Sequence, residues 1–263
     1  MKTPVPPPAR PPAFTLIELL VVISIIGILA GLLLPTLGRA KIKAQVAKAL
    51  LDVGKIANAT HSYESDNSGK FPVSANAMSA AAAASEDFTY GSTYKTPTGT
   101  ASVGISGLSY SANNSEPMAV LMDVENWPIA PGVATINKGH VKNPQRTPYL
   151  TVNRAPDTNS AGVGPDGNFR DPWGNPYVIT MDLNYDEKAR DGFYRNPMVS
   201  VGGLNGLILK ADANGTPVLV NGQQVYEANS PVMAWSVGPD GTIDPKDKAT
   251  AGANKDNVVG WRQ

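Results

Sequence analysis

The chain carries few of the residues that usually perform covalent or redox chemistry. Its 263 residues include no cysteine and two histidines, His61 and His140, which lie far apart in the sequence. Without cysteine there are no disulfides, no thiolate zinc sites and no cysteine nucleophile. The sequence also contains no Ser/His/Asp arrangement, P-loop or dinucleotide-binding fingerprint. We therefore expect that the chain is not an enzyme. We expect the His61 side chain to pack against the protein or to face solvent rather than to act in catalysis.

Carboxylates are the remaining candidates for chemistry, and three groups of them stand out. Glu18 is the single charge in the apolar run 14–34. An acidic run at 182–186 matches the first positions of an EF-hand loop, but Glu187 and Phe193 stand where that loop needs glycine and a bidentate glutamate, so we reject it. The third group lies among turn-forming residues late in the sequence: Asp240, Asp244, Asp247 and Asp256.

The element that must position Glu18 is a helix of membrane length. The run 14–34 has 21 residues, which as a helix span about 31 Å, close to the hydrocarbon thickness of a bilayer. A secretory signal peptide has a shorter apolar core with the small cleavage-site residue after it, whereas Ala13 lies before this run. A plain membrane anchor is the other alternative. A carboxylate costs about 2.5–3.5 kcal/mol at mid-membrane on insertion scales, so Glu18 is expected to have a partner or a role.

The residues around Glu18 resemble a known processing site. Residues 13–18 (AFTLIE), followed by the apolar run, are similar to the N-terminal segment of type IV pilins and type II secretion pseudopilins. This resemblance implies that a prepilin peptidase cuts before Phe14 and methylates the new amine, and that Glu18 is needed for assembly of the helices into a filament. The family has glycine before the cut, so Ala13 predicts slower processing.

Past the apolar run, residues 39–66 continue as an amphipathic helix. Apolar positions spaced four and three residues apart predict one face packed under a globular head. The turn cluster at 66–69 predicts the end of the helix. The predicted stripe consists of Ile42, Val46, Ala49, Val53, Ile56, Thr60 and Tyr63.

Short β-like runs begin beyond residue 137. They lie at 177–181, 199–201, 218–220, 225–227 and 232–237. Asn221-Gly222 predicts a two-residue hairpin turn. Over 67–136 a short helix at 80–84 is the one clear signal, and the rest predicts an irregular surface segment. The pattern predicts an α+β fold in which a long N-terminal helix packs on a small antiparallel β-sheet head, as in pilins.

The resemblance also implies a topology. Basic side chains both precede and follow the apolar run, so the positive-inside rule alone does not fix the orientation. The family places the leader in the cytoplasm, one helix across the inner membrane and the head on the periplasmic side. We therefore expect a cleaved leader, a transmembrane and amphipathic helix, an irregular variable region and a β-rich head, at residues 1–13, 14–66, 67–136 and 137–263.

Two later segments extend the resemblance. Residues 171–177 (DPWGNPY) look like the signature of the major, G-type pseudopilin of type II secretion, and residues 235–241 (WSVGPDG) are similar to that protein's C-terminal strand and loop. In that family the loop binds calcium through carboxylates and main-chain carbonyls. The loop here is longer and more basic, which leaves solvated turn aspartates as the alternative. The resemblance implies side-chain ligands Asp240 and Asp256, carbonyl ligands Val237 and Val258, and spare carboxylates Asp244 and Asp247.

The sequence Val-Gly-Pro-Asp-Gly occurs twice, at 163–167 and at 237–241. Each copy predicts a tight turn, because proline fixes φ and glycine takes positive φ without steric cost. Two copies are too few to predict a solenoid or propeller.

Together these features predict a structural subunit of a type II secretion-like pseudopilus. Its expected partners are further copies of itself, prepilin peptidase, other pseudopilins, the inner-membrane secretion platform and membrane lipid. The formal charge is zero, from 22 basic and 22 acidic side chains, so no nucleic acid partner is expected. Two alternatives stay open: a type IV pilus subunit for adhesion, motility or DNA uptake, and a membrane-anchored exported binding or enzymatic domain. A ligand-sized pocket with convergent polar groups would favour the latter.

Overall fold

The computed structural model describes residues 14–128, 134–212, 214–220 and 222–261. The predicted leader, with Ala13, lies outside the described residues, as does Asn221 of the predicted hairpin turn. The chain divides into two compact units, one up to Ala44 and one from Gln45 onward.

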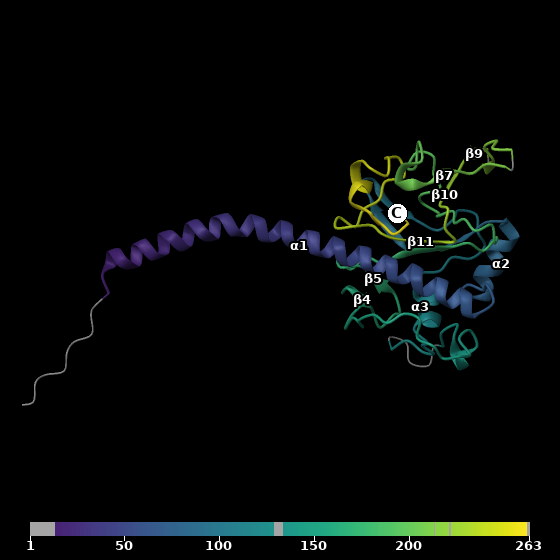
Figure 1. Cartoon of the computed structure of the whole chain (residues 1–263), viewed down its shortest axis with the longest axis horizontal. Helices are drawn as coiled ribbons and strands as arrows, with labels where there is room; N and C mark the ends of the chain where they lie inside the picture. The colour runs from purple at the N-terminus through teal and green to yellow at the C-terminus, as the bar shows by residue number, and fades with distance from the viewer. Residues whose placement is uncertain (1–13, 129–133, 213, 221, 262–263) are drawn as a thin grey trace, which may run out of the picture. The chain divides into compact units, whose positions relative to one another are not determined.

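The first unit contains the N-terminal part of helix α1 (Leu16–Asp66), which Figure 1 labels. The backbone stays helical from end to end, through Gly31 and Gly38. The large apolar side chains from Leu16 to Leu37 are 45–81% exposed. Over the part of the chain that the structure describes, α1 is the one helix long and apolar enough to cross a membrane.

α1 ends at Asp66, where the turn cluster predicts its end. The Asn67 N–H donates to the Tyr63 carbonyl at 3.0 Å, and the Gly69 N–H donates to the Glu64 carbonyl at 2.9 Å. Gly69 has φ +75°, which glycine adopts without steric cost. These bonds satisfy carbonyls that the last helical turn leaves open.

From Gln45 onward α1 belongs to the second unit, the head, and one of its faces is buried there. The predicted stripe is confirmed from Ala49 onward, and Val46 is half-buried. Ile42, which lies in the first unit, is instead 50% exposed. The buried members of the stripe are Ala49, Val53, Ile56, Thr60 and Tyr63.

A four-stranded antiparallel sheet lies at the centre of the head, in the order β1–β6–β11–β12. Successive β11 residues face opposite sides, as the pleat of a strand requires. Val232 and Ala234 belong to the apolar cluster that contains the α1 stripe, whereas Met233 and Trp235 belong to a second cluster. Because both faces are covered, all of β6 and β11 is buried. The strands are β1 (Phe88–Tyr90), β6 (Val178–Met181), β11 (Val232–Ser236) and β12 (Val258–Val259).

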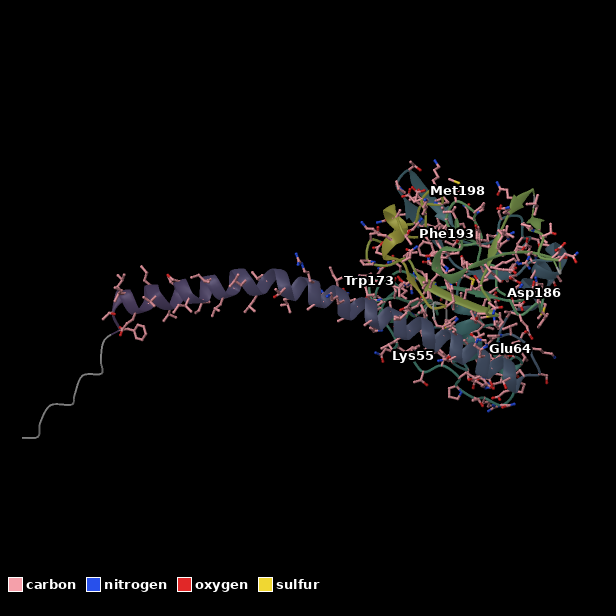
Figure 2. The ribbon with its side chains drawn as sticks, turned by 45° about the horizontal axis from the view of Figure 1, so that its top comes forward. Lys55, Glu64, Trp173, Asp186, Phe193 and Met198 are labelled. Carbon is pink, nitrogen blue, oxygen red and sulfur yellow. The ribbon has the colours of Figure 1, made fainter. Side chains whose placement is uncertain are left out.

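The second cluster is rich in aromatic rings. Phe193, labelled in Figure 2, stacks on Trp235 with 5.4 Å between ring centroids. The Asp191 carboxylate is fully buried beside them and accepts hydrogen bonds from Trp235 Nε1 at 3.0 Å and Thr180 Oγ1 at 2.7 Å. Burial raises the pKa of Asp191, and these neutral donors oppose that effect.

Short elements complete the head. Four two-stranded pairs are β2 (Thr93–Thr96) with β3 (Gly99–Ser102), β4 (Gly162–Val163) with β5 (Phe169–Arg170), β7 (Ile208–Leu209) with β10 (Tyr226–Glu227), and β8 (Leu219–Val220) with β9 (Gln223–Gln224). The remaining helices are α2 (Ala75–Ala84), α3 (Ser115–Leu121) and the 3₁₀ turns η1 (Lys138–His140), η2 (Leu204–Gly206) and η3 (Gly252–Asp256).

The α+β expectation is confirmed, and strands occur in four of the five predicted runs, as β6, β8, β10 and β11. The predicted strand at 199–201 is wrong. Val199 is buried, but it lies in a series of turns in which Gly202 and Gly203 take φ +70° and +73°. The Ser200 hydroxyl donates to the Tyr194 carbonyl and holds this turn in place of a sheet partner.

Residues 67–136 contain more regular structure than the sequence pattern predicts. α2 includes the predicted short helix at 80–84 and begins after Ser74, whose hydroxyl accepts from the Ala77 N–H at 3.1 Å. β1 joins the central sheet, and α3 contributes Met118 to the core. β1 has three residues, all buried, so it is too short and too uniformly buried to show a period in the sequence.

Candidate functional site

Glu18 lies in the first turn of α1 and caps the helix. Both the Thr15 N–H and the Thr15 hydroxyl donate to Glu18 Oε2, each at 2.7 Å, and the Glu18 N–H donates to Thr15 Oγ1 at 3.3 Å. This reciprocal pairing is a capping box, which satisfies N–H groups that a helix start leaves open. Reasoning about charge alone missed this role, although threonine and glutamate at this spacing carry the signal in the sequence.

The chain before this cap bears the proposed processing site. Phe14 is 75% exposed and precedes Thr15 directly, whereas Ala13 lies outside the described residues. In a chain that begins at Phe14, the new amine stands one residue before the group that already donates to Glu18. The site therefore combines an exposed carboxylate, local neutral donors and an apolar helix surface.

The DPWGNPY segment, residues 171–177, folds around the buried Asp171 carboxylate. Its Oδ1 accepts from the N–H groups of Trp173 and Asn175, each at 2.9 Å. Burial raises the pKa of Asp171, and these hydrogen bonds oppose that effect. Gly174 has φ +94°, and a Cβ there would lie 2.1 Å from the Asn159 carbonyl oxygen, so the turn requires glycine.

The same segment is tied to the packed part of α1. The Tyr177 hydroxyl donates to Asp52 Oδ2 at 3.2 Å, and Gln45 Nε2 donates to the Pro172 carbonyl at 3.3 Å. Asp52 is buried and also accepts from Lys48 Nζ at 2.8 Å. The segment therefore links the helix to the centre of the head.

DPWGNPY also holds the turn 238–241, the second Val-Gly-Pro-Asp-Gly copy. Asp171 Oδ2 accepts from the Ser236 hydroxyl at 2.6 Å, and Ser236 Oγ accepts from the Gly238 N–H at 3.0 Å. Asn175 Nδ2 donates to the Gly238 carbonyl at 3.3 Å. A Cβ on Gly241 would lie 3.0 Å from Asn175 Oδ1. The two segments that carried the family resemblance are therefore in direct contact.

Asp240 and Asp256 lie close together at this turn. Burial raises the pKa of Asp256, and the negative charge of Asp240 raises it further. Asp256 Oδ1 is buried without a hydrogen-bond partner. Gly238 has φ +75°, and a Cβ there would lie 2.3 Å from the Asp256 carbonyl oxygen. Val237 and Val258, the expected carbonyl donors, are buried beside the turn.

The spare residues Asp244 and Asp247 lie in the loop that Asn254 organises, and the Asp244 carboxylate accepts from the Lys246 N–H at 2.9 Å. The Asn254 side chain accepts from the Asp244 N–H at 2.8 Å and donates to the carbonyls of Asp244 and Asp247 at 2.7 and 3.0 Å. The Asp247 carboxylate packs on Gly252, where a Cβ would lie 1.7 Å from Asp247 Oδ2. Asn254 therefore organises the long loop, and no pattern in the sequence distinguished it from other loop asparagines.

The donors at the turn fit a hard cation. Calcium takes carboxylate and carbonyl oxygens, and the unpartnered buried oxygen of Asp256 is such a donor. Among the described residues, no group of three or more Asp, Glu or His side chains is placed to hold a metal ion. A cation at Asp240 and Asp256 would therefore depend on main-chain carbonyls and water for its other ligands.

In the first Val-Gly-Pro-Asp-Gly turn, at residues 163–167, the Asp166 carboxylate is paired with the guanidinium of Arg170. The Gly167 N–H donates to the Gly164 carbonyl at 2.9 Å, as the Gly241 N–H does to the Gly238 carbonyl at 3.3 Å. Asp166 accepts from Arg170 Nη1 and Nη2 at 2.8 and 2.6 Å.

The charges of the two turns differ accordingly. Burial would raise the pKa of Asp166, but the hydrogen bonds and charge of Arg170 outweigh it, and the pKa is lowered. None of the ion pairs within the described ranges includes Asp240 or Asp256, and the charge of Lys255 only partly opposes the raised pKa of Asp256. The second turn therefore holds two carboxylates without a paired cation.

The other polar groups that the sequence singled out form local structure. The Asp182 carboxylate accepts from the N–H groups of Tyr185 and Glu187, at 2.6 and 2.7 Å, so the EF-hand-like run folds around its own first carboxylate. His61 is on the surface, 3.5 Å from Glu64. His140 contacts Asp123 at 2.7 Å.

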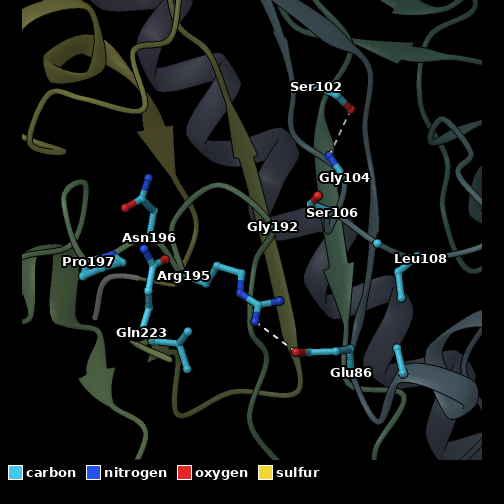
Figure 3. A pocket seen from close by; sticks show the side chains of 13 residues that line it. Glu86, Ser102, Gly104, Ser106, Leu108, Gly192, Arg195, Asn196, Pro197 and Gln223 are labelled. Carbon is cyan, nitrogen blue, oxygen red and sulfur yellow. Dashed lines mark hydrogen bonds and ion pairs between the residues drawn. The ribbon is translucent and has the colours of Figure 1, made fainter. Parts of the chain in front are cut away.

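A polar pocket of about 640 Å³ in the head has Glu86, Ser102 and Arg195 among its lining residues (Figure 3). Arg195 Nη2 donates to Glu86 Oε1 at 2.9 Å, so these charges are paired with each other. Ser102 Oγ accepts from the Gly104 N–H at 3.3 Å. No histidine is among the residues that line this pocket.

A comparison with protein families matches the N-terminal segment of the chain. The family described as the prokaryotic N-terminal methylation motif matches residues 12–34, which include Phe14 and Glu18. No solved structure matches the chain.

Three curated relatives are each named type II secretion system core protein G. The chain is 41% identical to that of Aeromonas hydrophila over 71 residues, which are 27% of this chain and 49% of the relative. It is 48% identical to that of Escherichia coli K12 over 54 residues, 20% of this chain and 37% of the relative. It is 46% identical to that of Vibrio cholerae over 55 residues, which are 21% of this chain and 38% of the relative. The matches span at most about half of these relatives, and they confirm the resemblance to G-type pseudopilins.

Proposed function

We propose that this chain is a structural subunit of a type II secretion-like pseudopilus. The observation that carries the proposal is the exposed apolar surface of α1 within the matched methylation motif. Such a surface is unfavourable in water, so it needs lipid before assembly and neighbouring helices after it. A subunit that moves between these two environments can build a filament from the membrane.

Processing prepares the subunit for this transfer. Prepilin peptidase cuts between Ala13 and Phe14, and the new amine is methylated. Glu18 then pairs with the terminal amine of a neighbouring subunit, because a carboxylate in a medium of low dielectric gains most from an opposite charge. The methylation motif and the position of Thr15 beside Glu18 support these assignments.

The subunit crosses the inner membrane once. Its N-terminus is cytoplasmic before processing, and its head is on the periplasmic side. Further copies, prepilin peptidase, other pseudopilins, the inner-membrane platform and membrane lipid are its partners. The apolar helix and the names of the matched relatives support this placement.

The work of the subunit is mechanical. A filament that grows from the inner membrane pushes exported proteins through an outer-membrane channel. The relatives named as secretion proteins, together with the DPWGNPY segment, favour this role over that of a type IV pilus subunit. The pocket in Figure 3 adds no support for an enzymatic head.

The turn 238–241 binds calcium. Asp240 and Asp256 are the side-chain ligands, and the carbonyls of Val237 and Val258 complete the protein's contribution. Bound calcium would neutralise the two carboxylates, as Arg170 neutralises Asp166 in the first turn. The unpartnered oxygen of Asp256 supports this assignment.

Assembly and secretion can be tested together in cells whose type II secretion system lacks its own core protein G. Wild-type chain should appear in the sheared filament fraction and restore export of a secreted protein. Glu18→Ala should insert in the membrane but fail in both assays. Wild-type chain that inserts and is processed, yet enters no filament, would show that the proposed function is wrong.

Calcium binding is tested on the full chain in detergent micelles. Calcium at 100 times its Kd should stabilise the head by about 2.7 kcal/mol, seen as a rise in Tm. The double variant Asp240→Asn, Asp256→Asn should lose this response. An unchanged wild-type Tm at millimolar calcium would count against the site.

A further inference from the structure

We infer that Asp171 and Ser236 are positioning residues for the calcium turn, because together they aim the Val237 carbonyl. This inference rests on the proposed calcium site. It concerns residues that make no contact with the ion themselves and lie in the DPWGNPY segment and at the end of β11.

The hydrogen-bond chain has one direction. An ionised carboxylate only accepts, so the Ser236 hydroxyl must donate its single proton to Asp171 Oδ2, at 2.6 Å. The lone pairs of Ser236 Oγ then face the Gly238 N–H, which donates to it at 3.0 Å. All three residues are buried, so water does not compete for these bonds.

Peptide planarity transmits this direction to the carbonyl. The peptide bond between Val237 and Gly238 is trans, so its N–H and C=O point to opposite sides of the chain. Because the N–H is bound to Ser236, the Val237 carbonyl must point away from Ser236. The hydrogen-bond chain from Asp171 through Ser236 to the Gly238 N–H, which we call the relay, therefore sets the orientation of the Val237 carbonyl oxygen before any cation binds.

The following peptide plane is fixed as well. The Gly238 carbonyl accepts from Asn175 Nδ2 and from the Gly241 N–H, both at 3.3 Å. Gly238 itself has φ +75° beside the Asp256 backbone, a place that no side chain fits. Carbonyl ligands held in this way bind a cation without first being ordered, which favours affinity.

The first turn, at residues 163–167, has the positive charge of Arg170 beside its aspartate and lacks the relay. Gly162 stands there at the position of Ser236, and Gly164, at the position of Gly238, donates instead to the Asn168 carbonyl at 3.0 Å. Arg170 supplies the positive charge in that turn. The relay thus occurs in the second turn, whose carboxylates need a bound metal ion to neutralise them. It is missing from the first turn, where Arg170 neutralises Asp166.

The test uses the full chain in detergent micelles and terbium as a calcium probe. Ser236→Ala should bind terbium at least tenfold more weakly. Luminescence lifetimes in H₂O and D₂O should count one additional water on the bound ion. In the metal-free protein, exchange of the Gly238 amide proton should become at least tenfold faster.

Matched variants separate positioning from stability. Ser74→Ala removes a buried serine cap at α2 and should lower Tm without changing terbium affinity or hydration. Ser236→Thr keeps the hydroxyl and should retain tight binding. If Ser236→Ala does not fold, Ser236→Gly replaces it, because glycine stands at the matching place in the first turn.

The outcomes distinguish the two claims. No terbium or calcium binding by the wild-type chain overturns the calcium site and the positioning role with it. Wild-type binding that the Ser236 variants leave unchanged in affinity and hydration overturns the positioning role alone. Weaker binding with an added water, restored in Ser236→Thr, establishes it.

Discussion

α1 runs as one helix from Leu16 to Asp66, but its two parts have opposite surfaces. Large apolar side chains from Leu16 to Leu37 are 45–81% exposed, whereas Val53 and Ile56 are fully buried in the head. The first part is apolar all round, as in a membrane span, and the second is apolar along a stripe, as in a surface helix of a globular protein. One backbone conformation therefore serves two environments.

This difference assigns two properties, stability of the head and assembly, to different parts of α1. Stability of the head depends on the buried stripe, whereas in the proposed function assembly depends on the exposed apolar surface and Glu18. Substitutions at distant, independent sites have additive effects, so each part can be changed without affecting the property of the other. The following experiments test that separation.

The largest expected effect is that of Ile56→Asp. Ile56 is fully buried in an apolar cluster, so a carboxylate there would lose its hydration, and the substitution should cost about 4 kcal/mol or more of the free energy of unfolding. Leu51→Asp is the matched control on the same helix, because Leu51 is 65% exposed. Thermal denaturation should show an unfolded or strongly destabilised head for Ile56→Asp and a near-wild-type Tm for Leu51→Asp. Equal losses in both variants would contradict the buried stripe.

A second contrast is the pH dependence of head stability. Burial raises the pKa of Asp87 from 3.8 to about 7, against the opposing charge of Arg190. Between about pH 4 and pH 7 the folded chain keeps this proton and the unfolded chain has lost it, so the free energy of unfolding falls as pH rises through that window. The effect is on the order of a few kcal/mol.

Asp87→Asn should flatten this dependence, measured by denaturant unfolding at several pH values. Asp171 and Asp191 are shifted in the same direction, so some slope should remain. A slope in the wild-type chain of opposite sign would contradict the burial of these carboxylates.

Glu18 provides the next contrast, because its effect should fall on assembly alone. Glu18→Ala should reduce filament incorporation at least tenfold, about 1.4 kcal/mol, with the Tm of the head unchanged. Glu18→Gln separates the two roles, since glutamine retains the capping geometry and lacks the charge. Assembly of Glu18→Gln at the wild-type level would assign the effect to the cap and remove the proposed pairing with an amine.

The smallest expected effect is that of Leu29→Ala, which is compared with the equivalent truncation Ile56→Ala. Ile56→Ala should cost about 2–5 kcal/mol through the cavity it leaves. Leu29→Ala, in the exposed part, should change the free energy of unfolding of the head by less than about 0.5 kcal/mol. Denaturant unfolding of both variants in the same detergent checks this. A loss of more than 2 kcal/mol for Leu29→Ala would show that the first part supports the head.

The sequence predicted the features that rest on contiguous patterns. The apolar run, the stripe and the end of α1 near Gly69 each carry a local signal, as does β11, an apolar run between turns. The run at 199–201 has the same composition as a strand, yet Val199 is buried through a turn. Composition cannot distinguish these cases, because both bury valine.

Candidate site residues were recognisable in the sequence when their chemistry conflicted with their surroundings. Glu18 is a charge in an apolar run, so it was recognisable, and Asp240 and Asp256 followed from resemblance. Ser236 was not predictable, because its bond to Asp171 joins residues 65 positions apart. Its serine side chain looks like any other in a strand until the fold brings the two together.

The most direct test of the central claim is the mass of the N-terminus of the protein isolated from membranes of a cell with prepilin peptidase. We predict a chain that begins at N-methylated Phe14. A chain that still carries the leader, or one cut after residue 34, would contradict the account, because neither presents the processed amine near Glu18 that the proposed assembly uses.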